Sequence, residues 1–391
     1  MPAWRAQRLD ALPPYLFVEI DRRKKAAIAA GKDVINFGIG DPDLPTPGFI
    51  VERMAAAIRD AANHQYPAGI GSPDFRRAAA DFCRRRFGVA LDPEREVIAL
   101  IGSKEGLGHV PLATVNPGEV VLVPSPGYPV YEAATIFAGA TPYRMLLREA
   151  DVWLPRLDDI PADVGRAAKL LFLNYPNNPT GACAPRAFYE RAVAFARQHE
   201  LLIVHDAAYS ELFLDPAHAP VSILEVPGAA EVAIELHSLS KTFNMTGWRL
   251  GFAIGHAGAL ASLAAVKSNV DSGPFNAIQQ AAIEALRQSS HRDVVACREI
   301  YRQRRDIVVD SLRKLGIAVQ SPQATFYVWA RCPDGYASLE FAARVLEEAA
   351  VVIIPGVGFG QAGEGYFRMA LTVPADRTRE AFARLERVRW W

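Results

Sequence analysis

The sequence lacks the usual features of secreted, membrane-bound and nucleic-acid-binding proteins. It has only four cysteines, with no CxxC pair and no histidine at zinc-ligand spacing, which favours reduced thiols, a cytoplasmic location and no metal site. No apolar run reaches the roughly 20 residues of a membrane span, and an acidic residue and two prolines interrupt the apolar N-terminal stretch. Lys plus Arg and Asp plus Glu both number 43, so no net charge attracts the chain to nucleic acid or to an anionic membrane.

The chain also lacks internal repeats, low-complexity tracts and a Gly/Ser linker. Its 391 residues nevertheless exceed the roughly 150 of an ordinary domain, so two domains, or a large and a small lobe, are expected. Between about residues 95 and 255, short apolar runs alternate with helical patterns, which predicts a mostly parallel sheet with helices on both faces. The expected strands are EVIALIG, GEVVLVPSP, AKLLFLNYP, LLIVHDAAY and VAIELHSLS.

The pattern changes after about residue 285. A long charged helical stretch, CREIYRQRRDIVVDSLRKLG, leads into alternating strands around TFYVWARCP and GYFRMALTV, which indicates a second, α+β lobe. The first forty residues, which end in DVINFGIGDPD, are expected to pack against this lobe.

Unusual polar residues follow three of the expected strands of the large lobe. They are residues 174–181, Asp206 with Tyr209, and residues 238–241. In such sheets ligands bind at the carboxyl ends of the strands, so these residues are expected to form one site.

The segment HSLSKTFNMTGWRLGFAIG, residues 237–255, brings together an amine, two hydroxyls and a guanidinium. A free lysine has a pKa of about 10.4 and is a poor nucleophile at neutral pH. Lys241, beside Arg249 and partly removed from water, is expected to have a lowered pKa, as Schiff-base lysines require. Ser238, Ser240 and Arg249 are suited to bind a dianionic phosphate. A phosphate together with a Schiff-base lysine indicates pyridoxal phosphate.

This cofactor requires a buried carboxylate that keeps its ring nitrogen protonated. Asp206, at the end of the apolar run LLIVHD, is the candidate, although most aspartates at such positions cap a helix or lie in a loop. Tyr209 and Asn178 can donate hydrogen bonds to the phenolic oxygen, and Tyr128 can stack on the ring. Taken alone, NYPNNPTG around Asn178 is also an ordinary turn, and Tyr128 is also an ordinary core aromatic.

The order of these motifs over almost the whole chain resembles the fold type I pyridoxal-phosphate enzymes, specifically the class I/II aminotransferases. The resemblance is carried by GIGDPDLPTP, NHQYPAGIGSPDFR, GSKEGL, PSPGYPVY, NYPNNPTG, HDAAYSE, SLSKTFNMTGWRLG and GYFRMALT. It implies an α/β fold with a mostly parallel sheet sandwiched by helices in the large domain, plus a smaller α+β domain. The expected division is an N-terminal arm with part of the small domain at 1–45, the large cofactor-binding domain at 46–285 and the small C-terminal domain at 286–391.

The resemblance implies a role for each matching residue. Lys241 would form the Schiff base, Asp206 would pair with the ring nitrogen, and Tyr128 would stack on the ring. Asn178 and Tyr209 would contact the phenolic oxygen. The matches around the phosphate are Ser103, Lys104, Ser238, Ser240 and Arg249, with Tyr66 reaching the phosphate of the neighbouring subunit. The last match implies a homodimer with shared active sites.

The same resemblance implies how the substrates bind. Arg368 matches the arginine that grips the substrate α-carboxylate by a bidentate pair, with the backbone of Gly40 and the side chain of Asn178 nearby. The family moves an amino group between an L-amino acid and a 2-oxo acid by a ping-pong mechanism through an aldimine and a ketimine, in which Lys241 is the general base. The peptide bond before Pro179 is expected to be cis.

Within the family, the chain most resembles the bacterial LL-diaminopimelate aminotransferases of lysine biosynthesis, through PPYLFVEIDRRK, LIGSKEG, HDAAYSE, KTFNMTGWR and VKSNVDSG. LL-2,6-diaminopimelate is therefore the expected donor and 2-oxoglutarate the acceptor. Two departures keep other donors open. Gly69 replaces a glutamate that plant-type enzymes use at the distal end of the substrate, and DSGPFN lacks the arginine of animal-type aspartate aminotransferases.

Several alternatives to this reaction remain. The donor can be succinyl-diaminopimelate, alanine or another amino acid, and the same fold supports elimination, cyclisation or oxidation. Tyr15 and Phe17 would form a lid over the side-chain pocket, or belong to an apolar arm that holds the dimer together. A formal GxGxxG in GVGFGQAG precedes an expected strand rather than a helix, so it indicates a close-packed loop before Arg368 and not a dinucleotide site.

Overall fold

The computed structural model describes residues 4–13 and 16–388. The strands form three sheets, of seven, three and two strands. The strands are β1 Ile35–Asn36, β2 Val97–Leu100, β3 Val120–Ser125, β4 Thr141–Leu146, β5 Ala168–Asn174, β6 Leu202–Asp206, β7 Ala233–Ser238, β8 Gly251–Gly255, β9 Tyr327–Arg331, β10 Val351–Val352, β11 Ile354–Pro355 and β12 Tyr366–Ala370. The α-helices are α1 Leu16–Ala29, α2 Gly48–Ala57, α3 Pro73–Phe87, α4 Ser103–Thr114, α5 Val130–Phe137, α6 Ala162–Ala167, α7 Arg186–His199, α8 Leu239–Thr242, α9 Ala257–Val270, α10 Asn276–Arg287, α11 Arg292–Lys314, α12 Ser338–Ala349 and α13 Ala375–Leu385.

The seven-stranded sheet has the order β2-β8-β7-β6-β5-β3-β4. Strand β8 is antiparallel to both of its neighbours, and every other pair is parallel. Alternate residues of β5 pack on opposite faces: Leu170 and Phe172 contact the core under α4 and α9, whereas Leu171 and Leu173 contact the core under α7. Burial on both faces explains the continuous apolar runs of the sequence, and the predicted mostly parallel sheet is confirmed.

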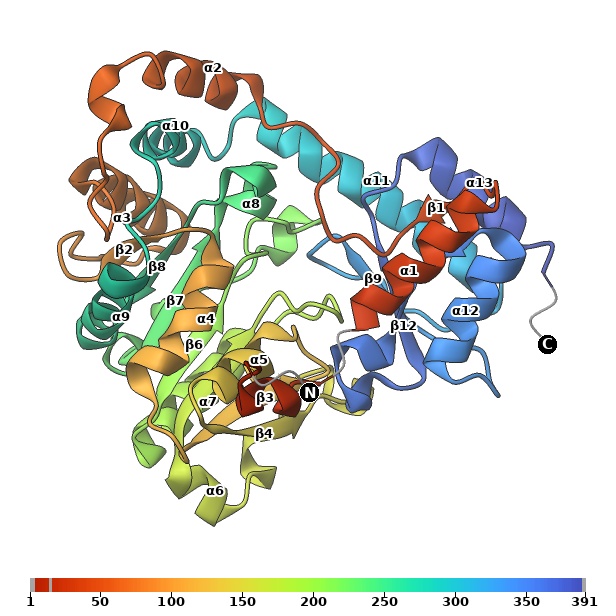
Figure 1. The fold of residues 1–391 in the computed structure, drawn as a ribbon, viewed down its shortest axis with the longest axis horizontal. Coiled ribbons are helices and arrows are strands. Elements are labelled where there is room, and N and C mark those ends of the chain that lie inside the picture. The colour runs from red at the N-terminus through yellow and green to blue at the C-terminus, as the bar shows by residue number, and fades with distance from the viewer. Residues whose placement is uncertain (1–3, 14–15, 389–391) are drawn as a thin grey trace.

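The second lobe contains the antiparallel sheet β11-β12-β9, in which Arg368 lies opposite Trp329. Figure 1 shows this blue C-terminal region beside the green and yellow sheet region, with α11 running between them. Its core combines residues of α11, α12 and α13 with Ile35 and Phe37 from the N-terminal part of the chain. The predicted α+β lobe is therefore confirmed.

The N-terminal part of the chain divides between the two lobes. Strand β1 pairs with β10, and α1 contacts α12, so both pack on the small lobe as expected. The short 3-10 helix η1, Gln7–Ala11, instead lies against α5 of the large lobe (Figure 1). The expectation for the first forty residues is thus correct for residues 16–40 and wrong for η1.

No helix within residues 4–13 and 16–388 is long and apolar enough to cross a membrane. All four cysteines are free thiols. The glycines of GVGFGQAG form two 3-10 turns, Gly356–Phe359 and Gln361–Gly363, and lead into β12, so the predicted loop is confirmed.

Candidate functional site

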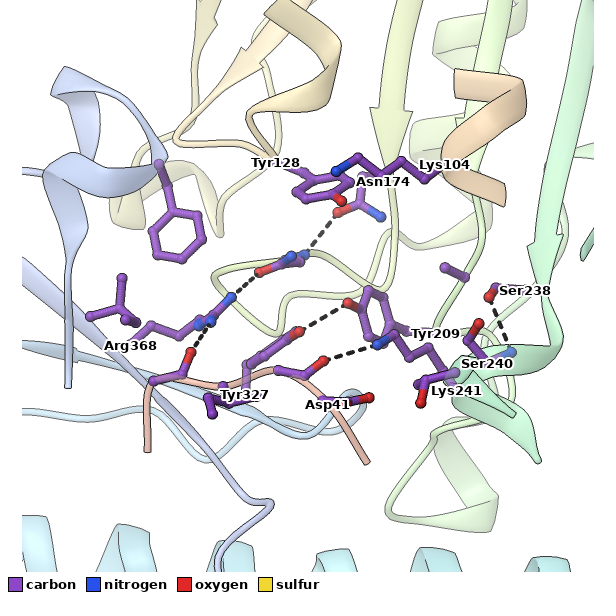
Figure 2. Close-up of a pocket in the computed structure, with 18 of the residues that line it drawn as sticks. Asp41, Lys104, Tyr128, Asn174, Tyr209, Ser238, Ser240, Lys241, Tyr327 and Arg368 are labelled. Carbon is purple, nitrogen blue, oxygen red and sulfur yellow. Dashed lines mark hydrogen bonds between the residues drawn. The ribbon is translucent and has the colours of Figure 1, made fainter. Parts of the chain in front are cut away.

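A cavity of about 540 Å³ lies where the two lobes meet, at the carboxyl ends of β5, β6 and β7 (Figure 2). Every site residue expected from the sequence lines this cavity, except Tyr66 and Tyr15. Tyr66 is 89% exposed and lies elsewhere on the surface. Tyr15 lies outside the described residues. The cavity thus gathers segments from residue 20 to residue 368 into one site.

Lys241 lies in the short helix α8, directly after β7. Its Nζ donates a hydrogen bond to the carbonyl oxygen of Gly40 at 2.9 Å. The pKa of Lys241 is lowered to about 8, mainly because the amine is buried; the positive charges of Arg368 and Arg249 add to this effect, and the negative charge of Asp41 opposes it. The lowered pKa expected from the sequence is confirmed, with desolvation as the main cause.

Asp206 ends β6 and is nearly fully buried. Its carboxylate accepts hydrogen bonds from the Tyr131 hydroxyl at 2.8 Å and from the backbone N–H of Ala208 at 3.3 Å. Both donors are uncharged, and burial raises the pKa of Asp206. Sequence reasoning missed Tyr131, whose only signal was a second tyrosine in PSPGYPVY, three residues after Tyr128.

One end of the cavity is built to bind an anion. Helix α4 begins at Ser103, so its free backbone N–H groups and the positive end of its dipole face this end. Gly102 has φ +74°, and a Cβ there would lie 2.2 Å from a guanidinium nitrogen of Arg249. Glycine therefore allows the arginine to close against the loop before α4. Ser238, Ser240 and Lys104 line the same cavity.

The opposite end carries a buried arginine (Figure 2). The guanidinium of Arg368 donates to the Asn178 side-chain oxygen at 2.9 Å and to the Gly38 carbonyl at 3.0 Å. It also lies over the rings of Tyr327 and Phe359, at 4.2 and 4.7 Å from their centroids. This packing holds the fork in place for a carboxylate.

Sequence reasoning missed several contacts at this end. The Gly40 carbonyl accepts a hydrogen bond from the amine of Lys241, and the Gly38 carbonyl accepts one from Arg368. Gly40 lines the cavity, and its expected contact with the substrate carboxylate stays a prediction. Sequence reasoning also missed Tyr327, whose hydroxyl is 3.0 Å from that of Tyr209. The same hydroxyl would lie only 2.1 Å from a Cβ on residue 40, so only glycine fits there. The Asn178–Pro179 peptide is cis, as expected.

A buried ionic cluster supports the anion-binding end. Glu105 accepts a hydrogen bond from the backbone N–H of Ile101, in the loop before α4, and pairs with Lys267 at 2.9 Å. Lys267 also pairs with Asp271 at 3.2 Å. The ammonium group thus lies where the nearby Glu105, His109 and Asp271 would otherwise favour a metal cation. The cluster therefore acts as an internal ion pair that fixes the loop.

The residues present fit pyridoxal phosphate. The helix N-terminus and Arg249 suit its phosphate, the amine of Lys241 suits its aldehyde, and the buried carboxylate of Asp206 has uncharged donors, so a protonated ring nitrogen would supply the missing positive partner. The volume is within the usual range for cofactor pockets.

Comparisons with known proteins agree with this site. The family model described as aminotransferase class I and II matches residues 32–385. The LL-diaminopimelate aminotransferase of Syntrophobacter fumaroxidans is 54% identical over 384 residues, 98% of each chain. Among solved structures, substrate-bound BacF from Bacillus subtilis has a TM-score of 0.93 at 37% identity, covering 98% of this chain and 97% of that one. A probable N-succinyldiaminopimelate aminotransferase from Thermus thermophilus has a TM-score of 0.89 at 37% identity, covering 95% and 99%.

Proposed function

The chain belongs to the class I and II aminotransferases, and we propose that it transfers an amino group from LL-2,6-diaminopimelate to 2-oxoglutarate with pyridoxal phosphate as its cofactor. The observation that carries the chemistry is the amine of Lys241, with its lowered pKa, in one cavity with Asp206 and Arg368. The donor is supported by relatives named LL-diaminopimelate aminotransferase, which are 50% to 55% identical over nearly the whole chain.

Each group of cavity residues would contact a particular part of the cofactor. Asp206, oriented by Tyr131, would pair with the ring nitrogen, and Tyr128 would stack on the ring. Asn178 and Tyr209 would contact the phenolic oxygen. The phosphate would be held by Ser103, Lys104, Ser238, Ser240 and Arg249. When bound, pyridoxal phosphate supplies an electron sink for the pair of electrons left at the substrate Cα.

The reaction needs a cation that binds the substrate α-carboxylate and a base that removes the Cα proton. Arg368 binds the substrate α-carboxylate in a bidentate pair, and its contact with Asn178 fixes the angle of the fork. Lys241 would take the proton from the substrate Cα on Nζ, because a pKa near 8 leaves a useful neutral fraction of the amine at neutral pH. The Gly40 carbonyl, 2.9 Å from Nζ, orients this amine. The same residues act in reverse on the 2-oxo acid.

We also propose a cytoplasmic homodimer in which Tyr66 contacts the phosphate bound by the neighbouring subunit. The high exposure of Tyr66, away from the cavity of its own chain, supports this role, and four free cysteines support a reducing compartment. The proposed domains are an N-terminal arm with part of the small domain at 1–45, the large cofactor-binding domain at 46–285 and the small C-terminal domain at 286–391, with Ile35 and Phe37 packed in the core of the last.

The test is a donor assay with purified holoenzyme and 2-oxoglutarate. LL-diaminopimelate is expected to yield one glutamate per donor consumed, and faster than succinyl-diaminopimelate or alanine. Ammonia release without an acceptor would instead identify an elimination. Lys241→Ala is expected to abolish turnover and the visible absorbance of the bound cofactor, whereas the surface variant Lys25→Ala keeps both. Turnover of succinyl-diaminopimelate alone would replace the proposed donor with that one.

A further inference from the structure

Two charged side chains of the cavity have no part in the chemistry described above. The charged residues that line it are Asp21, Lys24, Asp41, Lys104, Asp206, Lys241, Arg249 and Arg368. Five of these hold the cofactor, the reacting amine or the α-carboxylate, and Asp41 acts on the charge of Lys241. Asp21 and Lys24 remain. Both come from helix α1, in the N-terminal part of the chain, and not from the strands that carry the expected cofactor-binding residues.

Helix α1 presents one face to the cavity. Ile20, Asp21 and Lys24 line it, and their spacing of one and four residues brings them to the same side of a helix. Ile20 packs against the cluster that contains Trp329 and Phe359, and Phe359 also lies over the guanidinium of Arg368. The charged face of α1 is therefore held next to the end of the cavity that receives the substrate carboxylate.

Exposure separates the lysines of this helix. The side chain of Lys24 is 21% exposed, whereas that of Lys25 is 75% exposed, although both pair with Asp21. Lys24 lies 2.5 Å from Asp21, one helical turn away. Lys24 is thus turned toward the cavity and Lys25 toward water. An ion pair within one exposed helix contributes little, so a ligand of the same charges can replace it.

A carboxylate and an ammonium one turn apart complement a group that carries an ammonium and a carboxylate on one carbon. We propose that Asp21 and Lys24 form the distal subsite for the substrate, in which Asp21 binds the distal ammonium and Lys24 the distal carboxylate. This proposal rests on the proposed function. Gly69 has no side chain to offer and nothing within 4 Å of the position a Cβ would take, so it provides no distal acid from that loop. The substrate class is a diamino-dicarboxylic acid with both ends charged.

The experiment compares donors that carry different distal groups, with 2-oxoglutarate as acceptor. LL-diaminopimelate has both distal charges, 2-aminoheptanedioate has only the carboxylate, lysine has only the ammonium, and 2-aminoheptanoate has neither. The variants are Asp21→Asn and Lys24→Met. Their matched controls are Glu19→Gln and Arg22→Met, which alter an ion pair on the same helix outside the cavity.

The readout is kcat/KM for each donor divided by that for 2-aminoheptanoate. Both cavity variants are expected to lower the ratio for LL-diaminopimelate at least tenfold, since a charged hydrogen bond is lost. Asp21→Asn is expected to lower the ratio for lysine but not for 2-aminoheptanedioate. Lys24→Met is expected to lower the ratio for 2-aminoheptanedioate but not for lysine. The control variants keep the wild-type ratios.

Equal ratios in wild type and both cavity variants would overturn the subsite while leaving the proposed donor intact. Equal losses in the cavity variants and the controls would also overturn it, because they would indicate a general effect of charge on α1. Failure of the wild-type enzyme to use LL-diaminopimelate would overturn the proposed donor, and the subsite with it.

Discussion

Replacing Tyr131 by phenylalanine tests how the protein keeps a buried carboxylate ionised. The Tyr131 hydroxyl donates to Asp206 at 2.8 Å, and its ring stacks on Phe172 at a centroid distance of 5.0 Å. Tyr131→Phe therefore removes the hydrogen bond and keeps the ring packing. Burial already raises the pKa of Asp206, and the Tyr131 hydroxyl opposes that rise.

The expected size of the effect follows from the hydrogen bond. A hydrogen bond to a charged acceptor contributes about 1.5 to 3 kcal/mol, and about 1.4 kcal/mol corresponds to one pKa unit. Part of the bond survives when the acid is protonated, so the pKa of Asp206 is expected to rise by about one unit. The ionised form pairs with the ring nitrogen, so activity falls as the pH falls through this pKa. The acid limb of kcat/KM should move to higher pH by about one unit in Tyr131→Phe.

The matched control is Tyr175→Phe. Tyr175 is equally buried and donates to the Trp153 carbonyl at 2.7 Å, but it does not line the cavity. Both variants are expected to lose about 1 kcal/mol of unfolding free energy, measured by urea denaturation, while only Tyr131→Phe shifts the acid limb. Coincident acid limbs in Tyr131→Phe and wild type would refute the role of this hydroxyl, since the fold would be intact and the pairing unaffected.

Three further experiments test other parts of the site. In the cofactor-free protein, acylation of Lys241 should reach half its maximal rate near pH 8, well below the value of exposed lysines, and a midpoint near pH 10 would contradict its desolvation. Gly102→Ala should weaken cofactor binding at least tenfold, measured by absorbance titration, because the new methyl would lie 2.2 Å from a guanidinium nitrogen; Gly118→Ala has a similar positive φ with nothing within 4 Å and should bind normally. Arg368→Lys should raise KM for donor and 2-oxo acid alike by about 10- to 100-fold through loss of the bidentate pair, whereas the exposed Arg331→Lys should match wild type in the same assay.

The sheet could be read from the sequence because its strands are buried on both faces. LLIVHD and AIELHS are largely apolar segments, the second interrupted by Glu235, that each end in polar residues, and they form β6 and β7 as expected. The placement of η1 could not be read in this way. Its segment is short and contains no buried residue, so no periodicity indicates which lobe it contacts.

The site was predictable where chemistry demands a particular residue type. An amine, a buried carboxylate and phosphate donors have few substitutes, so Lys241, Asp206 and Arg249 were recognisable. Tyr131 and Tyr327 were missed because an aromatic residue in a buried segment looks like core, and only the folded chain brings their hydroxyls to polar partners. The contact between Arg368 and the Gly38 carbonyl was missed for the same reason, since backbone carbonyls leave no mark in a sequence.

Burial separates the charges of the cavity into two groups with different consequences. Asp206 and Arg368 are almost fully buried at strand positions, so removal of either leaves buried groups uncompensated and is costly both for folding and for chemistry. Asp21 and Lys24 lie on a helix with water on its other side, so their partners stay solvated after a substitution. Changes on α1 can therefore alter which donor is preferred while the core and the reacting groups stay intact. It follows that exchanging residues 21 and 24 for those of an aminotransferase with an apolar donor should move the preference toward 2-aminoheptanoate and leave the unfolding free energy nearly unchanged. A loss of folding on that exchange would contradict this division between the two groups of charges.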